Sequence, residues 1–257
     1  MIGPDRVATL WIGDALGMVE RACLRAAVRQ GHAVTLYCYD QPQGVPEGVA
    51  VADAARVVPS DRVVRYPNGS VALFSNLFRY EVQRQGLGTW IDTDIYLLHP
   101  LGFDAPYLFG YEQPGMLNNA VLRLPADSPI LPALTAPFDG QTIPDWLSWR
   151  ERWRAKGRLR REGRSDVARM PWGATGPRAL TALARRHGLD RWAVPVETFY
   201  PVHYAQADWV LDPATSVDRV IAPDTVAIHL WNEVIRPFKE LPAPRGSFLH
   251  RLHREGA

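Results

Sequence analysis

The sequence predicts an α/β fold in which helices flank a mostly parallel central β-sheet. The chain opens with a strand, a helix and a second strand within about 30 residues, which is the βαβ unit of a parallel sheet. Its 257 residues are 47% hydrophobic, so the chain can bury a sizeable core without disulfide bonds. We therefore predict a single domain over residues 1–257.

The opening unit follows from local patterns. Residues 7–12 form an apolar run typical of a buried strand. Residues 18–30 place apolar side chains at helical spacing, and Gly31 is suited to end that helix. Residues 32–40 are rich in β-branched and aromatic side chains and predict the second strand.

The next segment, residues 41–70, holds four prolines and three glycines and predicts a loop. Residues 70–86 then predict a helix, with Ser70 as its N-cap and Gly86 just past its end. Further strands are expected over 88–101, 107–111, 119–124 and 225–232. Further helices are expected from Ser128, over 144–156, and over 177–187 with Pro177 in the first turn.

The strand over 88–101 is interrupted by the tripeptide Asp92-Thr93-Asp94. Strand side chains alternate between faces, so these two carboxylates point the same way. They repel each other unless a cation lies between them, and oxygen ligands suit Mg²⁺ or Mn²⁺. Because ligands of open α/β sheets bind beyond the carboxyl ends of the strands, the pair indicates a metal site for a phosphate ligand. A solvated acidic turn is the alternative.

The helix before this strand carries Asn76 and Arg79 on one face, three residues apart. A guanidinium offers planar, paired donors that suit carboxylate, phosphate or sugar oxygens. Arg79 therefore becomes a candidate for binding the same ligand. An ion pair with Glu81 or with a neighbouring loop is the alternative.

Residues 74–101, FSNLFRYEVQRQGLGTWIDTDIYLLHPL, resemble the SD-x-x-RY…GG-x-Y-x-D-x-D block of the DXD-containing retaining sugar transferases. That group includes α-1,4-galactosyltransferases, bacterial capsular-polysaccharide transferases, yeast initiating mannosyltransferases and clostridial glucosylating toxins. Other segments are similar to further blocks of the family, in family order: 10–13, 111–131, 175–177, 199–204 and 227–232. The resemblance thus spans nearly the whole chain.

The resemblance implies a GT-A fold that uses a nucleotide-sugar, above all a UDP-sugar, together with Mn²⁺ or Mg²⁺. Residues 1–101 would form the nucleotide-binding half, ending in the DXD motif, and residues 102–257 the acceptor-side half. The implied activity is retaining transfer of a hexose to a glycan or lipid-linked acceptor in bacterial surface polysaccharide synthesis. A catalytically weak nucleotide-sugar or carbohydrate-binding protein, and a toxin-like enzyme that glycosylates a protein, remain alternatives.

The resemblance also assigns roles to residues. Metal ligation falls to Asp92, Asp94 and His229, and catalytic contacts fall to Asp92 and Asn119. Substrate contacts fall to Trp11, Asn76, Arg79, Trp90, Asp92, Asn118, Trp231 and Asn232. His229 could instead be a core histidine on a strand, and the two adjacent asparagines could belong to an ordinary turn.

The chain departs from the family pattern at three places. Asn76 stands where the family usually carries Asp; it keeps hydrogen-bonding capacity but loses the charge. Trp90 replaces a frequent Tyr before the acidic pair and can stack but offers no hydroxyl. Gly86-Leu87-Gly88 replaces a Gly-Gly pair. The change at Asn76 bears on sugar selectivity, and none of the three changes removes the metal site.

Residues 146–169 combine tryptophans with basic side chains. Trp146, Trp149 and Trp153 are spaced by three and four residues, and nine basic residues face three acidic ones over the segment. A helical tryptophan stripe beside arginines suits an anionic membrane surface or a lipid-linked acceptor. One alternative is a core helix anchored by the tryptophans and followed by a solvated loop. Another is a nucleic-acid-binding surface, which also combines aromatic and basic side chains.

Composition and charge indicate the cellular compartment of the protein. The two cysteines, Cys23 and Cys38, can build neither a disulfide scaffold nor a four-ligand zinc site, which favours a reducing cytoplasm. Asp14 and Glu20 interrupt any secretory signal, and no apolar run approaches the ~20 residues of a membrane span. A net charge of +2 does not call for nucleic acid. We expect a cytoplasmic protein, with peripheral inner-membrane contact through residues 146–169 as the open alternative.

Overall fold

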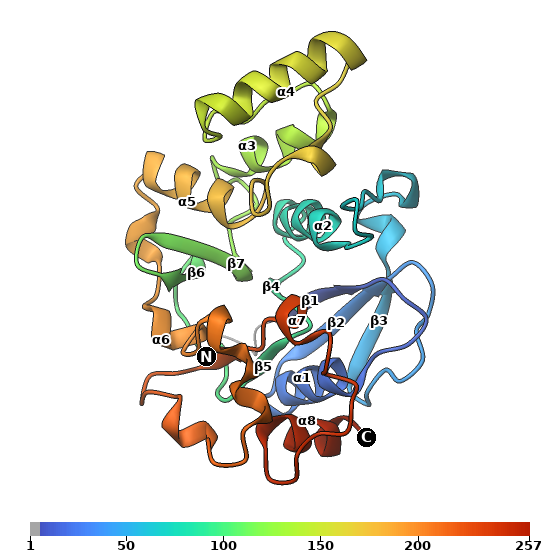
Figure 1. Ribbon diagram of the computed structural model, residues 1–257, viewed down its shortest axis with the longest axis vertical. Coiled ribbons are helices and arrows are strands. Elements are labelled where there is room, and N and C mark those ends of the chain that lie inside the picture. Colours follow the sequence, from blue (N-terminus) through green and yellow to red (C-terminus); the bar gives the residue numbers. More distant parts are fainter. Residues whose placement is uncertain (1–5) are drawn as a thin grey trace.

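The computed structural model describes residues 6–257, so the first five residues of the predicted domain lie outside it. A six-stranded sheet runs through the middle of the molecule in the order β3-β2-β1-β4-β7-β6 (Figure 1). Its strands are β1 Arg6–Trp11, β2 Ala33–Cys38, β3 Val49–Asp53, β4 Thr89–Ile91, β6 Leu108–Gln113 and β7 Met116–Arg123. A second, two-stranded sheet pairs β5 Ile95–Leu97 with β8 Ala227–His229.

The pairing directions confirm an α/β fold with a mostly parallel central sheet. Strand β1 pairs in parallel with β2 and β4, and β2 pairs in parallel with β3. The hairpin of β6 and β7 completes the sheet by antiparallel pairing with β4. The helices are α1 Met18–Arg29, α2 Ala72–Arg84, α3 Leu131–Thr135, α4 Trp149–Glu162, α5 Pro177–Arg186, α6 Val196–Phe199, α7 Asn232–Ile235 and α8 Phe248–Gly256.

Alternation along the strands gives the sheet two buried faces. Trp90 and Leu122 point into the core beneath α2, α3 and α5. Their strand neighbours Ile91 and Val121 point into a core on the other face, which includes side chains of α1. Both faces are covered, as expected for strands that read as continuous apolar runs.

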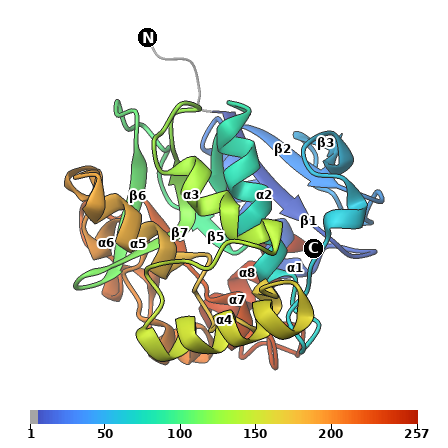
Figure 2. The same cartoon turned by 90° about the horizontal axis from the view of Figure 1, so that it is seen from above.

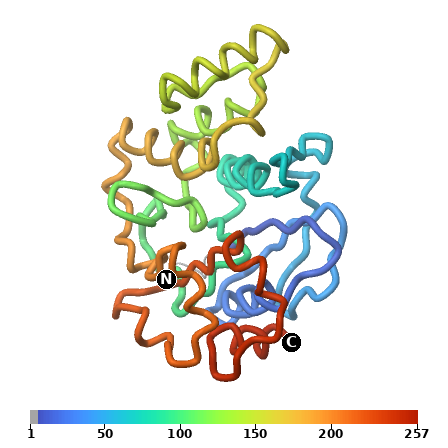
Figure 3. Tube along the Cα trace, viewed as in Figure 1, coloured from blue at the N-terminus to red at the C-terminus, as the bar shows by residue number. Residues whose placement is uncertain are grey.

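The C-terminal helix α8 returns to the start of the chain and packs on α1 (Figure 3). Gly256 permits this approach, because a Cβ there would lie within 1.9 Å of the carbonyl oxygen of Met18. Helices α1 and α8 also share a third apolar core with β5 and β8. The last quarter of the chain is thereby fixed against the nucleotide-binding half expected from the sequence.

Several predicted boundaries are wrong. The predicted loop 41–70 contains β3, an edge strand whose exposed and half-buried side chains give little apolar pattern. The helix predicted over 144–156 begins at Trp149, where Ser148 and Glu151 form a capping box, and runs to Glu162. The helix expected from Ser128 is the five-residue α3. The strand expected over 225–232 is confined to β8.

Helix α2 confirms the central part of the predicted helix 70–86. Its N-cap is Val71, and the hydroxyl of Ser70 instead accepts a hydrogen bond from the backbone N–H of Ala72 at 3.3 Å. Among residues 6–257, no helix is both long and apolar enough to cross a membrane. Cys23 and Cys38 are free and buried.

Gly88 is required where α2 turns into β4. Its φ is +130°, and a Cβ would lie 2.5 Å from the carbonyl oxygen of Arg6. We expect Gly88→Ala to lower the free energy of unfolding by about 2–4 kcal/mol, from backbone strain and overpacking. Gly86 is the matched control: its φ is +63° and nothing lies within 4 Å of a Cβ, so Gly86→Ala should cost only about 1–2 kcal/mol. Equal losses in urea denaturation would contradict this account.

Candidate metal centre

The acidic pair lies where the chain leaves one sheet for the other. Strand β4 ends at Ile91, and the backbone N–H of Asp92 still bonds to Ala120 of β7 at 2.8 Å. Asp94 comes just before β5, whose Ile95 pairs with His229 of β8. The interruption predicted within residues 88–101 is therefore the passage between two sheets. It brings a residue from far along the chain to the carboxyl end of β4.

Three side chains converge at this point. One ligand atom each from Asp92, Asp94 and His229 lie within 4.8 Å of one another, and Nε2 of His229 is 3.2 Å from Oδ2 of Asp94. The other ring nitrogen of His229, Nδ1, is buried and has no hydrogen-bond partner in the described chain. Two carboxylates and one imidazole can hold a divalent metal ion and leave coordination positions open for a second ligand.

The charged groups of the cluster shift one another's pKa values. Burial lowers the pKa of His229, but the carboxylates of Asp94, Asp92 and Glu112 together outweigh burial and raise that pKa. Burial would raise the pKa of Asp94, but His229 and the N–H of Asn232 hold it below the usual range. Burial raises the pKa of Asp92; Arg79 opposes this shift, and the like charge of Asp94 adds to it. A metal ion would bind the neutral form of His229 and the ionised forms of the two carboxyl groups.

We expect the affinity for Mn²⁺ to fall as the pH falls, starting above pH 6.5. His229 must be neutral to ligate a metal, and its pKa is raised from the ordinary value of 6.5. Without metal the sign is opposite: the His229–Asp94 ion pair stabilises the fold below the raised pKa, and this stabilisation is lost as the pH rises through it. Calorimetric titration of Mn²⁺ at several pH values measures the first effect. A His229→Gln variant with an unchanged pH profile would remove His229 from the ligand set.

The side chains of Trp90 and Arg79 hold the carboxylate of Asp92 in place. Nε1 of Trp90 donates to its Oδ1 at 2.6 Å, and the guanidinium of Arg79 lies 3.0 Å from the same oxygen. Arg79 also stacks on the Trp90 ring, with 5.1 Å between the guanidinium carbon and the centroid. Trp90 is only 1% exposed. Its polar contact with the cluster is the hydrogen bond to Asp92.

The remaining donors of Arg79 are also occupied. Its Nε donates to the carbonyl of Ser75 at 3.1 Å, and its Nη1 donates to the carbonyl of Asn119. The side chain is 5% exposed. Arg79 thus joins α2, β7 and the acidic pair, and it fixes the orientation of Asp92.

The two asparagines of β7 enter different networks, because consecutive strand residues point to opposite faces. The amide of Asn119 donates to Asn76 at 2.9 Å and to the hydroxyl of Tyr80 at 3.1 Å. The amide of Asn118 donates to Glu112 at 2.6 Å. Asn76 continues the first network by donating to the Thr175 hydroxyl at 3.3 Å. All three asparagines are buried, and each is held by side-chain hydrogen bonds within the protein.

The segment after β8 forms one wall of the cluster, through contacts with His229 and Asp94. Trp231 is the non-glycine residue with a positive φ (57°) among residues 6–257, and its ring lies 4.1 Å from that of His229. This left-handed turn aims the backbone N–H of Asn232 at Oδ2 of Asp94, at 2.7 Å. Strained residues of this kind cluster at functional sites. Trp11 lies at the carboxyl end of neighbouring β1 and is half-buried.

Sequence patterns missed a buried ion pair behind this wall. The side-chain oxygen of Asn232 accepts from Nζ of Lys239 at 2.7 Å, and Nζ also pairs with Glu20 of α1. The Glu20 side chain is fully buried. No local pattern marks this pair, since the partners are 219 residues apart. Glu20, taken alone, reads as an acidic residue in the first turn of a helix.

Tyr200 and Glu112 are further residues whose positions the sequence did not settle. The Tyr200 ring stands nearly perpendicular to that of His229, with centroids 5.6 Å apart, and fixes the imidazole plane. Burial raises the pKa of Glu112, although the hydrogen bond from Asn118 opposes the shift. The charge of Glu112 also raises the pKa of His229, so β6 places a third carboxyl group near the cluster.

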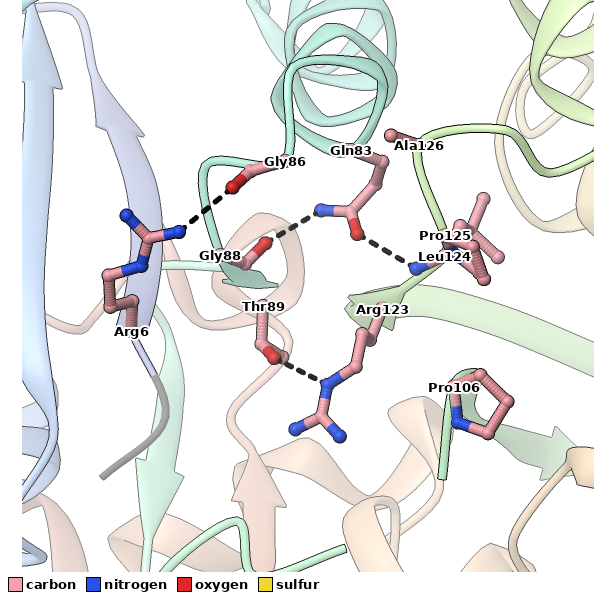
Figure 4. A pocket seen from close by; sticks show the side chains of 10 residues that line it. All are labelled: Arg6, Gln83, Gly86, Gly88, Thr89, Pro106, Arg123, Leu124, Pro125 and Ala126. Atoms are coloured by element: carbon pink, nitrogen blue, oxygen red, sulfur yellow. Dashed lines mark hydrogen bonds between the residues drawn. The ribbon is translucent and has the colours of Figure 1, made fainter. Parts of the chain in front are cut away.

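A separate depression lies at the opposite, amino end of the parallel strands (Figure 4). The polar groups drawn there pair among themselves: Arg6 with the carbonyl of Gly86, Gln83 with Gly88 and Leu124, and Arg123 with Thr89. These bonds fasten the end of α2 to β1 and β7. We assign this depression a structural role.

No protein-family model matches the chain, and no curated protein matches it in sequence. The features of the chain that bear on its function are the geometry around Asp92, Asp94 and His229 and the ordered motifs of the sequence.

Proposed function

We propose that this protein is a metal-dependent, retaining glycosyltransferase with a GT-A fold. It would move a hexose from a UDP-sugar to a glycan or lipid-linked acceptor in bacterial surface polysaccharide synthesis. The observation that supports this most strongly is the convergence of Asp92, Asp94 and His229 at the carboxyl end of β4. The reaction is inferred from the resemblance of the ordered motifs to the DXD sugar transferases. The cluster supplies the metal ligands that this reaction would require.

In this proposal the three residues hold Mn²⁺ or Mg²⁺, which neutralises charge on the diphosphate leaving group. Arg79 and Trp90 keep Asp92 in one orientation through the bonds at 3.0 and 2.6 Å. The backbone N–H of Asn232 holds the carboxylate of Asp94 by a hydrogen bond to its Oδ2. These groups are oriented before the ligand arrives, which reduces the cost of assembling a reactive geometry.

The acceptor side is assigned to the β6–β7 hairpin and the loop that carries Tyr200. Glu112, with its raised pKa, and Asn118 form a hydrogen-bonded pair there. We assign this pair to acceptor hydroxyl groups. Retention requires the acceptor hydroxyl to approach the face from which the nucleotide leaves, so the leaving phosphate takes up its proton. The two free cysteines suit a reducing cytoplasm as the setting.

The test is a panel of nucleotide-sugars with the full chain and Mn²⁺. We expect one UDP-sugar to raise the melting temperature only when Mn²⁺ is present and to be hydrolysed slowly, with NMR showing retained anomeric configuration. Binding without hydrolysis or transfer would favour a nucleotide-sugar-binding protein, in which neutral Asn76 replaces a needed charge. Absence of metal-dependent binding of any nucleotide-sugar would overturn the proposal.

A further inference from the structure

Helix α4 stands at the edge of the molecule and leaves most of its surface uncovered (Figures 1 and 2). Of its 14 residues, only Ala155 is buried. Trp149 is 72% exposed and Trp153 is 73% exposed. Side chains of this size are rarely left in water without a partner, because each forfeits a large hydrophobic gain.

The three tryptophans of the predicted stripe differ in exposure: Trp146 is half-buried, whereas Trp149 and Trp153 are exposed. Nε1 of Trp146 donates to the carbonyl of Ala174 at 2.7 Å. Trp149 and Trp153, four residues apart, lie on one face of α4. Trp146 lies before the first residue of α4, and within α4 only Ala155 is buried, so the alternative of a tryptophan-anchored core helix is wrong.

The exposed face is basic as well as aromatic. Its exposed cationic side chains are Arg150, Arg152, Arg154, Lys156, Arg160 and Arg161. The two acidic residues of α4 are engaged elsewhere: Glu151 pairs with Arg178 at 2.8 Å and Glu162 with Arg169 at 3.2 Å. Both lie on the flank away from the tryptophans, since helical spacing places them beside Ala155. The aromatic face therefore carries uncompensated positive charge.

A shallow hollow adjoins this face. It is lined by Trp153, Gly157 and five arginines, and Nε of Arg158 within it is buried without a hydrogen-bond partner in the described chain. Grouped guanidinium groups with free donors suit phosphate oxygens. The hollow thus adds a place for an anionic group beside the exposed tryptophans.

We propose that α4 is a docking surface for an anionic lipid bilayer, with Trp149 and Trp153 at the depth of the headgroups. Tryptophan prefers that interface, and arginines beside it meet the negative surface potential. A second copy of this chain is a poor occupant, because two such faces repel each other. Single-stranded nucleic acid prefers a groove in which bases stack in succession, whereas α4 presents a convex helix. The inference does not depend on the proposed function.

The experiment is co-sedimentation of the full chain with vesicles of phosphatidylcholine alone or with about one-third phosphatidylglycerol. We expect binding to the anionic vesicles only, weakened by salt. Each arginine removed should lower the partition coefficient about fivefold, so the triple variant Arg150→Ala, Arg154→Ala, Arg161→Ala should lose about 100-fold. The double variant Trp149→Ala, Trp153→Ala should also lose binding. Melting temperatures should not change, since these side chains are exposed.

Matched controls are Arg56→Ala, Arg62→Ala, Arg254→Ala as a triple variant and Trp172→Ala, all at exposed positions outside α4. Both controls should bind like the parent protein. Equal binding to neutral vesicles, or no binding to anionic vesicles at low salt, would overturn the proposal. Binding of a single-stranded oligonucleotide, lost in the α4 variants while vesicles are not bound, would assign the surface to nucleic acid instead.

Discussion

Asp94→Asn is expected to abolish Mn²⁺-dependent binding of the UDP-sugar while the protein stays folded. The amide oxygen can still accept the N–H of Asn232 and a hydrogen bond from His229, which Asp94 now receives at 2.7 and 3.2 Å. It cannot supply the negative charge that draws a divalent ion. Removing a residue that only hydrogen-bonds to a metal ligand lowers metal affinity about 10–100-fold. Removing a direct ligand should therefore lower it by more than 100-fold.

Calorimetry with Mn²⁺ and UDP measures this loss, and circular dichroism checks the fold. Asp208→Asn is the matched control, because Asp208 is exposed and lies outside the cluster. It should bind metal and nucleotide like the parent protein. If Asp94→Asn retained the parent affinity for Mn²⁺ and UDP, the metal assignment would fail.

Lys239→Met is expected to cause the largest loss of stability. Removing this cation leaves the carboxylate of Glu20 fully buried with no counter-charge, and Oε2 of Glu20 already has no partner among residues 6–257. Breaking a buried ion pair from one side costs about 3–5 kcal/mol. The variant also removes the hydrogen bond that Nζ of Lys239 donates to the side-chain oxygen of Asn232 at 2.7 Å. Nucleotide binding should therefore weaken, even at a temperature at which the variant remains folded.

Urea denaturation of a double-mutant cycle tests this account. The combined variant Glu20→Leu, Lys239→Met replaces the pair by apolar side chains, and it should recover most of the lost stability. Nucleotide binding should stay weakened in the combined variant, because Asn232 still lacks its donor. A loss below about 1 kcal/mol for Lys239→Met alone would show that the pair does not bear on stability.

The cluster of Asp92, Asp94 and His229 was partly predictable because its two aspartates form a local pattern. Asp92 and Asp94 are two residues apart at the end of an apolar strand, which is enough to predict a shared direction. His229 has no such local signal, and only its place in the ordered family motifs suggested it. Glu20 and Lys239 could not be found, since a charge on a helix or loop reads as solvated until its distant partner is known.

Elements with weak side-chain patterns were the other failures. Strand β3 is held by backbone pairing with β2, and its side chains face mostly solvent, so hydropathy does not mark it. The spacing of Trp146, Trp149 and Trp153 predicted a helical stripe but not which members would be covered. Burial depends on the neighbouring segment around Ala174, and periodicity carries no information on that segment.

The antiparallel pairing of β5 with β8 has a consequence for the order of folding. Asp94 and Asn232 are 138 residues apart in the chain, so their contact requires a long loop to close before any bond compensates the lost entropy. Such non-local contacts form late, and during synthesis a chain grows at about 5–20 residues per second. For several seconds a nascent chain would carry Asp92 and Asp94 without their histidine. A metal ion that uses all three ligands would therefore stabilise the cluster only after β8 has been made, by about 2.7 kcal/mol at 100 times its dissociation constant.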